Sequence, residues 1–388
     1  MSNVGLRIIV LSPFFPPDKG GVESFLEAVC TEFKAGQLDY RVITFHPLKE
    51  SNSLVDNTDP SIIRIPWFGK GVFDKISHRP ALVFSYLAIP YLLFATIIGV
   101  RHGRSARKLV LLGNGLIGSM AAIFIGKLLG KGRIVSTFHA VYENISPIII
   151  KFFVFVWSRS DKVLACSATV KSQIITEYSI AKTKTDIFYY WIDRAVLAHS
   201  NRSINKTISD IPRIGFIGRL IPEKGVTVMA TVARSCNVKV IVYGTGPMES
   251  QCLAMAAENK NFIFKGKLER EDLATALCEL DFLIIPSFYT EAGPIVLIEC
   301  LSFGVIPIIT NTSGYSDLLR GSSLESLIVD PTEQAVVSCV QKSIAASQSQ
   351  LVRWREECLN VYQRYFSPDI ATPRFLNVVG IKNAVQTR

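Results

Sequence analysis

The chain has 388 residues, of which 49% are apolar and 19% are charged. This length suits two domains of ordinary size, and the apolar content supplies a core for both and excludes a disordered chain. The mean hydropathy of +0.31 is high for a freely soluble enzyme, so the composition also points to contact with a membrane surface.

The net charge of +10 is concentrated in the first half of the chain. Residues 1–200 carry 23 Lys and Arg against 14 Asp and Glu, a net charge of +9, whereas residues 201–388 carry 19 against 18. No acidic residue lies between Asp74 and Glu143, and the basic residues of that segment are Lys75, Arg79, Arg101, Arg104, Arg107, Lys108, Lys127, Lys131 and Arg133. We therefore expect the first half to meet an anionic partner.

The eight cysteines are never spaced as C-x-x-C, and most lie in apolar runs. This spacing indicates reduced core residues and argues against a zinc site, so we predict no bound metal. The first residues contain Pro13, Pro16 and Pro17 and lack the apolar run of a secretion signal. We therefore expect a cytoplasmic protein.

Short β-branched runs alternate with helical stretches in the first half, which is typical of a parallel sheet covered by helices. The first helix, residues 22–33, has apolar residues at positions i, i+3, i+4, i+7 and i+11. The predicted strands are Leu6–Ser12, Tyr40–Phe45, Ile62–Ile65, Leu109–Gly113, Arg133–Phe138, Lys162–Ala165 and Thr185–Phe188.

Residues 81–100 form a run of 20 uncharged, mostly apolar residues, long enough to cross a bilayer of about 30 Å. A single crossing would place the strands predicted before and after this run on opposite sides of the membrane, although they look like parts of one sheet. Pro90 also lies in the middle of the run. We therefore predict a buried or surface-lying helical hairpin here.

The polar stretch 198–210 has the composition of a linker, and the alternation of strands and helices then restarts. The predicted strands are 213–217, 239–243, 261–264, 282–286 and 306–310, with helices at 226–234, 248–259, 270–280, 294–303 and 332–366. We predict an α/β chain of two Rossmann-like βαβ domains facing across a cleft. The first spans residues 1–200 and the second 205–366, and a C-terminal segment, 367–388, crosses back toward the first.

A first candidate phosphate site follows strand 213–217, where Gly218 and Arg219 lead to Lys224 at the start of a helix. A turn from strand to helix exposes amide N–H groups and the positive end of the helix dipole, so it favours an anion. The alternative is that both cations are solvated turn residues. A second turn contains Gly244 and Gly246, but Glu249 stands where a dinucleotide fingerprint has its third glycine, so an ordinary tight turn is an equal alternative.

A pair of carboxylates completes the pattern. Glu291 follows an apolar strand, and Gly293 and Pro294 open a helix that continues through Ile295 to Glu299. Carboxylates near the carboxyl end of a strand suit hydrogen bonding to vicinal hydroxyls, as on sugars and ribose. Glu299 has apolar neighbours on both sides, which argues against a plain surface charge.

These motifs together resemble glycosyltransferase family four, whose members are retaining enzymes with the GT-B fold. The resemblance rests on G-R-L-x-x-x-K-G at 218–225, G-x-G-P at 244–247 and E-x7-E at 291–299, and it covers the second half. In the first half it is thinner and consists of Gly20, Gly21 and His139. A lone histidine is more often a structural residue, but the position of His139 directly after a strand makes a functional role an equal alternative.

The resemblance implies metal-independent transfer from a UDP- or GDP-sugar, with no further cofactor. Arg219 and Lys224 would hold the donor diphosphate, Glu299 the ribose and Glu291 the donor sugar. Main-chain groups around Gly266, Lys267 and Leu268 would bracket the base. Gly20 and Gly21 would allow close approach to the phosphates, and His139 would face the reacting sugar. The donor-binding set also includes Gly218, Gly244, Gly246, Gly293, Pro294 and Ile295.

The chain departs from the family pattern at several positions. Gly293 and Pro294 replace an aromatic residue and a glycine, Asp317 stands where a glutamate is frequent, and residues 190–193 replace Asn-Gly-Val-Asp. None of these changes removes a charged donor ligand, but they leave the identity of the sugar open.

The basic first half is interpreted as the acceptor side, with an apolar helical pair lying on an anionic membrane leaflet. We expect a lipid-linked or polysaccharide-precursor acceptor of cell-envelope glycan biosynthesis, such as lipopolysaccharide, and peripheral attachment to the inner face of the cytoplasmic membrane. A solvated cationic face over an ordinary core is the alternative. Two further hypotheses are a nicotinamide-dependent oxidoreductase and a membrane protein anchored by residues 81–100. Nucleic acid is a poorer partner, because no aromatic-basic reader motif is present.

Overall fold

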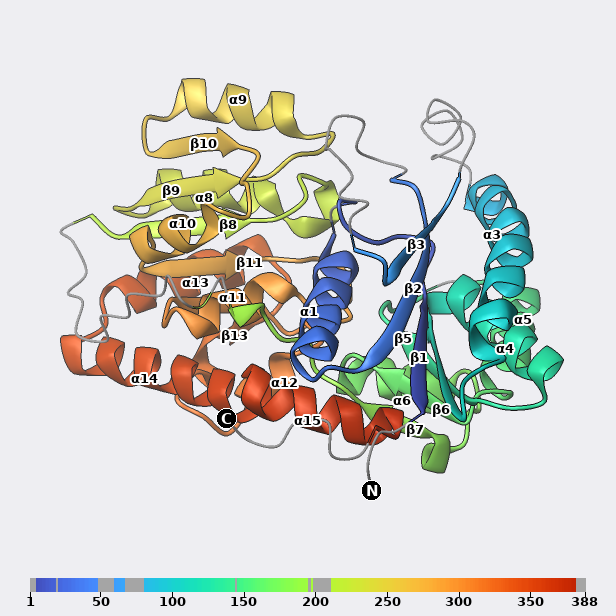
Figure 1. Ribbon diagram of the computed structural model, residues 1–388. Coiled ribbons are helices and arrows are strands. Elements are labelled where there is room, and N and C mark those ends of the chain that lie inside the picture. Colours follow the sequence, from blue (N-terminus) through green and yellow to red (C-terminus); the bar gives the residue numbers. More distant parts are fainter. Residues whose placement is uncertain are drawn as a thin grey trace. The chain divides into compact units, whose positions relative to one another are not determined.

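The computed structural model describes residues 5–18, 20–47, 59–66, 80–143, 145–194, 197 and 211–381. The chain divides into two units (Figure 1), of which unit 1 comprises residues 1–189 and 371–388 and unit 2 comprises residues 190–370. The predicted linker 198–210 lies outside the described residues, as do Lys75 and Arg79 of the basic segment.

Unit 1 is built on a parallel sheet with the strand order β3-β2-β1-β4-β5-β6-β7. Its strands are β1 (Leu6–Leu11), β2 (Asp39–Phe45), β3 (Ile62–Ile65), β4 (Lys108–Asn114), β5 (Arg133–Phe138), β6 (Lys162–Ala165) and β7 (Thr185–Ile187). Its helices are α1 (Gly21–Ala35), α3 (Pro80–Gly103), α4 (Gly115–Leu129), α5 (Pro147–Trp157), α6 (Ala168–Thr176), the short 3₁₀ helix η1 (Lys182–Lys184) and most of α15 (Pro368–Val379). The strands predicted for the first half are confirmed, with ends that differ by at most one residue.

Unit 2 repeats this plan with the strand order β10-β9-β8-β11-β12-β13. Its strands are β8 (Arg213–Ile217), β9 (Lys239–Tyr243), β10 (Phe262–Gly266), β11 (Phe282–Ile285), β12 (Ile306–Thr310) and β13 (Ile328–Val329). Its helices are η2 (Pro222–Lys224), α8 (Val226–Ser235), α9 (Glu249–Glu258), α10 (Leu273–Glu279), α11 (Ile295–Ser302), α12 (Ser316–Leu319), η3 (Glu325–Leu327), α13 (Glu333–Ile344) and α14 (Gln348–Tyr365). The predicted helical run 332–366 is therefore two helices, separated near Ala345–Ser347.

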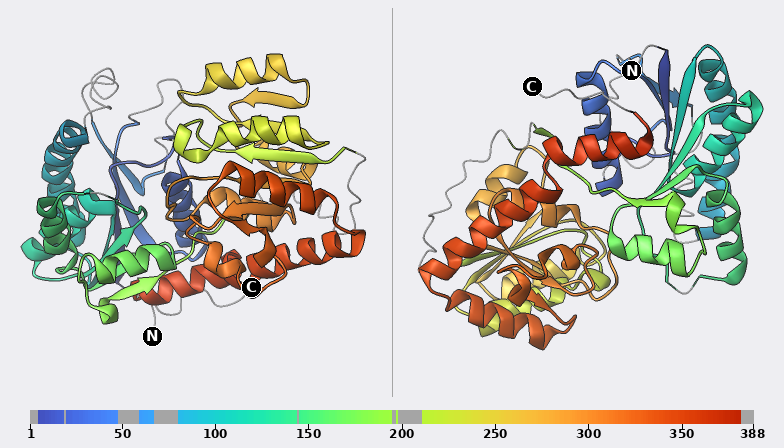
Figure 2. Two further views of the ribbon diagram at one scale, coloured as in Figure 1. Left: turned by 180° about the vertical axis from the view of Figure 1, so that it is seen from behind. Right: turned by 90° about the horizontal axis from the view of Figure 1, so that it is seen from below.

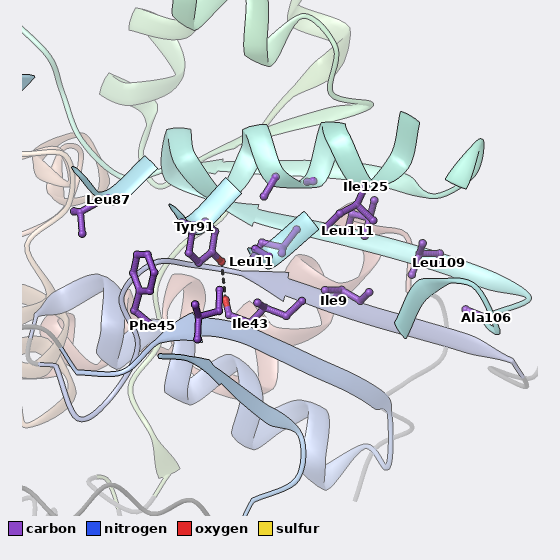
Figure 3. Close-up of a cluster of buried hydrophobic side chains, with 14 residues drawn as sticks. Ile9, Leu11, Ile43, Phe45, Leu87, Tyr91, Ala106, Leu109, Leu111 and Ile125 are labelled. Carbon is purple, nitrogen blue, oxygen red and sulfur yellow. Dashed lines mark hydrogen bonds between the residues drawn. The ribbon is translucent and has the colours of Figure 1, made fainter. Parts of the chain in front are cut away.

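The two faces of the unit 1 sheet are covered by different helices. Alternate strand residues such as Ile9, Leu11 and Ile43 point toward α3 and α4 and form a buried cluster with them (Figure 3). On the opposite face, Phe25 of α1 packs edge-to-face against Phe375 of α15, with ring centroids 5.8 Å apart. Burial on both faces explains why the strands read as continuous apolar runs.

The prediction of a helical hairpin at residues 81–100 is wrong, because α3 is one continuous helix from Pro80 to Gly103 with Pro90 inside it. Pro90 removes one backbone donor without ending the helix, since packing on the sheet holds both halves in line. The side chain of Tyr91 is fully buried, and its hydroxyl donates a 2.6 Å hydrogen bond to the carbonyl oxygen of Ile43 in β2 (Figure 3).

We expect Tyr91→Phe to lower the free energy of unfolding by about 1 kcal/mol, which corresponds to a fall in Tm of roughly 2–4 °C. The loss is modest because the Ile43 carbonyl oxygen keeps a second donor, the Ser12 N–H at 3.2 Å. Urea and thermal denaturation followed by circular dichroism measure the change. Tyr142→Phe, at a side chain that is 38% exposed, is the control and should leave stability unchanged. A Tyr91→Phe protein as stable as the parent would contradict this account.

Candidate functional site

The predicted donor-binding residues of unit 2 gather at one edge of its sheet. Because its strands are parallel, their carboxyl ends all lie along the same edge. β8 leads into Gly218 and Arg219, and β11 leads into Glu291. The other predicted residues on this edge are Lys224, Gly244, Gly246, Lys267, Leu268, Gly293, Pro294, Ile295 and, within α11, Glu299.

The two glycine turns of this edge pack against each other. The N–H of Gly218 donates to the carbonyl oxygen of Tyr243 at 3.1 Å, and the N–H of Leu220 donates to that of Thr245 at 2.9 Å. A Cβ atom at Gly244 would lie only 1.9 Å from the carbonyl oxygen of Gly218. The glycine at position 244 is thus required by contact between neighbouring turns, which supports the tight-turn interpretation of the G-x-G motif.

Gly225 fixes the turn that carries Lys224. This glycine has φ +69°, and a Cβ atom there would lie 2.2 Å from the carbonyl oxygen of Pro286, at the end of β11. The N–H of Phe288 also donates a 2.8 Å hydrogen bond to the carbonyl oxygen of Glu223. The loops after β8 and β11 are therefore joined directly through their backbones.

This junction places Lys224 beside Glu291, although 67 residues separate them in the sequence. The Lys224 Nζ atom lies 2.5 Å from Oε2 of Glu291, and the two side chains are 18% and 5% exposed. The Ser287 hydroxyl donates to the other carboxylate oxygen, Oε1. Lys224 Nζ also lies 5.5 Å from the centroid of the Tyr289 ring. A buried carboxylate needs such partners, because an isolated buried charge is strongly unfavourable.

Ser287 is held in turn by the end of β12. The hydroxyls of Thr310 and Thr312 donate to its carbonyl oxygen at 2.9 and 2.8 Å, and the N–H of Glu291 donates to the carbonyl oxygen of Thr312 at 2.9 Å. Sequence reasoning assigned these hydroxyl residues no role. The available signal was a pair of threonines, one that ends an apolar strand and one that lies two residues beyond it.

Glu299 has a different environment, five residues into α11. Burial raises the pKa of its carboxyl to about 7, and the positive charge of Arg270 partly opposes that rise. Within the described residues, neither Glu299 nor the exposed Arg219 forms an ion pair or side-chain hydrogen bond with Lys224 or Glu291. The structure thus joins Lys224 and Glu291 directly and places Arg219 and Glu299 on the same edge without direct contact.

Lys267 and Leu268 follow β10 at the same edge. Lys267 forms a 2.8 Å ion pair with Glu269, and both side chains are about half exposed, at 49% and 45%. Such an exposed pair adds little stability. In the part of the chain that the structure describes, no three His, Cys, Asp or Glu side chains gather where they could hold a metal ion.

The carboxyl edge of the unit 1 sheet carries His139 in a chain of hydrogen bonds. Nε2 of His139 lies 2.7 Å from the Thr137 hydroxyl, which donates to Oδ1 of Asn114 at 3.0 Å. Nδ2 of Asn114 donates to the Ser12 hydroxyl at 2.9 Å. Because the Thr137 proton is already used, Nε2 of His139 carries the proton of this contact. Burial lowers the pKa of His139 to about 3, so the ring is neutral at pH 7.

Of these residues, the sequence predicted only His139. Asn114, Thr137 and Ser12 each lie within one residue of the carboxyl end of an apolar strand of unit 1, and that position was the available signal. Gly20 and Gly21 lie at the same edge, where the backbone passes from the loop after β1 into α1. The carbonyl oxygen of Gly20 accepts the N–H of Ser24 at 3.0 Å, which closes the first turn of that helix.

The architecture is that of GT-B glycosyltransferases. The chain is similar to a glycosyltransferase from Rickettsia africae, with a TM-score of 0.73, 19% identity and coverage of 97% of this chain and 99% of that one. It is equally similar to Anabaena Alr3699/HepE solved in complex with UDP, with a TM-score of 0.74, 13% identity and coverage of 96% and 99%. These likenesses confirm the predicted fold class.

Residues 200–357 match the family described as Glycosyl transferases group 1. Granule-bound starch synthase 1 from Arabidopsis thaliana is 26% identical over 157 residues, which cover 35% of this chain and 25% of that protein. A GDP-mannose-dependent alpha-mannosyltransferase from Corynebacterium glutamicum is 30% identical over 117 residues, which cover 30% and 27%. The chain thus spans about a quarter of the length of these relatives.

The backbone junction at Gly225 can be tested against a second glycine of the same conformation. Gly321 has φ +72° but no atom within 4 Å of an added Cβ, so Gly321→Ala should cost only the backbone penalty of about 1–2 kcal/mol. Gly225→Ala adds a clash with a backbone carbonyl and should cost more than about 3 kcal/mol. Urea denaturation measures both changes. Equal losses for the two variants would show that the close approach to Pro286 is unimportant.

Proposed function

We propose that this protein is a retaining glycosyltransferase that moves a sugar from a nucleotide-diphosphate donor to a lipid-linked or polysaccharide-precursor acceptor. The observation that carries the proposal is the contact between Lys224 and Glu291. A cation and a carboxylate that reach the same point can contact the two chemically different parts of a nucleotide sugar. The phosphates need positive charge, and the sugar hydroxyls need acceptors.

The chemistry follows from where negative charge grows. When the bond between the anomeric carbon and the phosphate oxygen breaks, its electron pair stays on the departing nucleotide diphosphate. Lys224 and Arg219 would stabilise that charge, assisted by the N-terminal ends of α8 and α11, which begin at this edge. Fixed cations and helix dipoles together can replace a divalent metal, so we propose metal-independent transfer.

The other donor contacts follow the family resemblance. Glu291 would accept hydrogen bonds from the donor sugar and Glu299 from the ribose, with the backbone of residues 266–268 beside the base. UDP and GDP both remain candidates, because Alr3699/HepE was solved with UDP and the C. glutamicum relative is named for GDP-mannose. Donor-binding roles for Gly20, Gly21 and His139 rest on the resemblance alone.

For the acceptor, we propose a precursor of cell-envelope glycans, with lipopolysaccharide as one candidate, used at the inner face of the cytoplasmic membrane. The support is the basic, acid-free segment between Asp74 and Glu143, which suits an anionic lipid carrier. This part of the proposal is independent of the donor chemistry.

A nucleotide-sugar screen tests the donor proposal. At about 100 times Kd, one UDP- or GDP-sugar should raise the Tm by roughly 5–10 °C, and EDTA should not reduce that shift. Lys224→Ala and Glu299→Ala should each abolish it, because each removes a donor contact. Lys239→Ala, at an exposed lysine that begins β9, is the control and should keep the full shift. A shift that survives in the Lys224→Ala protein would refute the assigned role.

The raised pKa of Glu299 predicts how donor affinity depends on pH. Ribose hydroxyls favour the ionised carboxylate as acceptor, so affinity should fall as pH drops below about 7, by up to tenfold per pH unit. Isothermal titration calorimetry between pH 5.5 and pH 8.5 measures this change, and the donor diphosphate itself does not titrate in that range. Glu299→Gln should bind more weakly with a flat profile. An equally steep profile in that variant would assign the titration to another group.

A further inference from the structure

Helix α3 is apolar around its whole circumference, but only one side of it is buried. Leu87, Tyr91 and Ala95 lie one turn apart and enter the core of unit 1. The opposite side carries Ile89, Leu93 and Ile97, which are 70%, 57% and 60% exposed. A helix that is hydrophobic all round is expected in a protein core or in contact with lipid. The unit 1 sheet covers one side of α3 and leaves the opposite apolar side exposed.

The buried side excludes a membrane crossing by α3. The stretch Tyr86–Gly103 is long and apolar enough to span a bilayer, and 33% of it is buried in the structure. However, β2 before the helix and β4 after it both pair with β1, and Tyr91 donates a hydrogen bond to β2. The helix therefore lies flat on the sheet, with its second apolar side directed outward.

The next two helices extend this exposed surface. α4 packs against both α3 and α5, and all three lie together on one side of unit 1 in all three views (Figures 1 and 2). We call their exposed apolar side chains the apolar face, which comprises Ile89, Leu93, Phe94, Ile97, Phe124, Leu128, Ile148, Ile149 and Phe155. Large exposed apolar surfaces mark sites of interaction with a protein or a membrane.

Every charged residue within the three helices of the apolar face is a cation. The sequences of α3, α4 and α5 contain no acidic residue, and the exposed acids Glu143 and Asp161 lie outside α5, one on either side of it. The exposed cations on the helices or just beyond them include Arg101, Arg104, Lys127, Lys151 and Arg159. All of these cations except Lys151 lie near the carboxyl ends of the helices. Because helices that connect parallel strands run in the opposite direction to the strands, these cations lie near the amino ends of the strands.

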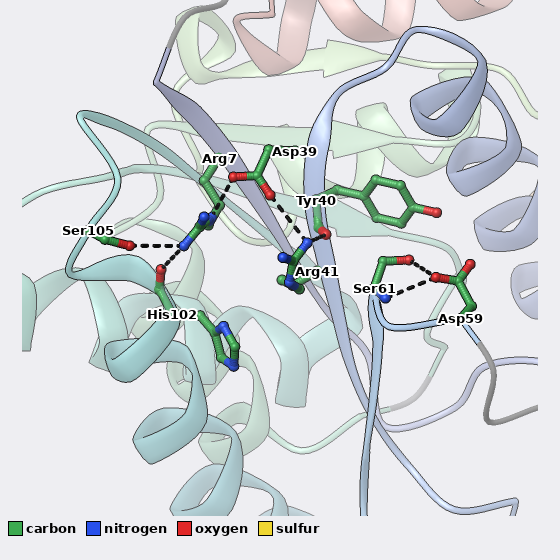
Figure 4. Close-up of polar contacts among 8 residues, drawn as sticks. All are labelled: Arg7, Asp39, Tyr40, Arg41, Asp59, Ser61, His102 and Ser105. Atoms are coloured by element: carbon green, nitrogen blue, oxygen red, sulfur yellow. Dashed lines mark hydrogen bonds and ion pairs between the residues drawn. The ribbon is translucent and has the colours of Figure 1, made fainter.

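One carboxylate at this end of the sheet, that of Asp39, is already engaged by other residues. Asp39 is already shared by two strand arginines, with Arg7 Nε at 2.7 Å and Arg41 Nη1 at 3.2 Å (Figure 4). Arg7 also donates to the carbonyl oxygen of His102 at 2.7 Å, which ties this pair to the end of α3. The cationic end of the apolar face thus keeps its excess of positive charge.

We propose that the apolar face of α3, α4 and α5 is the surface by which this protein docks on an anionic lipid bilayer. The exposed Ile, Leu and Phe side chains enter the interfacial region, and the flanking Arg and Lys side chains contact lipid phosphates. The surface does not depend on the donor chemistry proposed above. Ile148 and Ile149 begin α5 within ten residues of His139, so the docked face reaches the carboxyl edge of the unit 1 sheet.

A second copy of this chain is a poorer occupant of the face. A symmetric dimer would bring the same patch of each copy together, and with it two sets of cations that have no acidic counterpart on these helices. Such a contact would bury like charges, whereas an anionic bilayer supplies the missing opposite charge.

Vesicle flotation of the full chain tests this proposal. We expect binding to vesicles of phosphatidylglycerol and phosphatidylcholine at 50 mM salt, weak binding to phosphatidylcholine alone, and release of much of the bound protein at 500 mM salt. Leu93→Glu should reduce binding at least tenfold, whereas Leu253→Glu should not. Leu253 is the matched control, since it is a leucine on α9 of unit 2 with 60% exposure against 57% for Leu93.

The cationic end is tested separately. Arg101→Gln combined with Lys127→Gln should weaken binding roughly 25-fold, because each cation near an anionic surface contributes about fivefold. The pair Arg320→Gln and Lys342→Gln in unit 2 is its control and should bind as the parent does. Equal binding by the Leu93→Glu and Leu253→Glu proteins would overturn the proposal. So would a failure to float with anionic vesicles, or a dimer in analytical ultracentrifugation that Leu93→Glu dissociates. Thermal shifts with nucleotide sugars should be unchanged in every variant, which separates this test from the donor proposal.

Discussion

The arrangement of the loops at the carboxyl edge of the unit 2 sheet depends on direct contacts between their backbones. The turn at Gly225 abuts the carbonyl oxygen of Pro286, and the turn at Gly244 abuts that of Gly218, at separations that no Cβ atom would allow. These contacts join the ends of β8, β9 and β11 into one surface. The position of Lys224 beside Glu291 follows from them, since Lys224 ends the one-turn helix η2 and Glu291 lies in the loop before α11, where no long element sets its place.

The two glutamates of the E-x7-E motif have the same side chain but different surroundings, and these surroundings give the two carboxyl groups different properties. Glu291 lies between the Lys224 ammonium group and the Ser287 hydroxyl, so its negative charge is paired with a cation from the turn after β8. Glu299 has apolar neighbours on α11, and its proton is lost only near neutrality. A site with one ion-paired carboxylate and one whose pKa is raised by burial can treat two hydroxyl-bearing parts of a ligand differently.

Much of this arrangement could be predicted from the sequence. The apolar runs predicted nearly every strand. The spacing of glycines, cations and glutamates predicted which edge of the unit 2 sheet carries the candidate site. The single helix at 80–103 was missed because Pro90 was interpreted as a break, and packing on the sheet overrides that local signal. Positions near strand ends marked several of these polar residues, but their hydrogen bonds, such as those of Ser287 and of the chain from His139 to Ser12, could not be predicted. Hydrogen bonds between distant polar side chains leave no periodic pattern in a sequence.

The placement of α15 has a consequence for biosynthesis. Residues from Ala371 onward belong to unit 1, where Phe375 packs on Phe25 and the Val378 carbonyl oxygen accepts a 3.1 Å hydrogen bond from Arg133. Unit 2 is therefore translated in full before the last part of unit 1 leaves the ribosome. Unit 1 is thus the first unit to leave the ribosome and the last to be completed. While unit 2 is synthesised, the exposed apolar helices α3, α4 and α5 belong to a unit whose core still lacks α15.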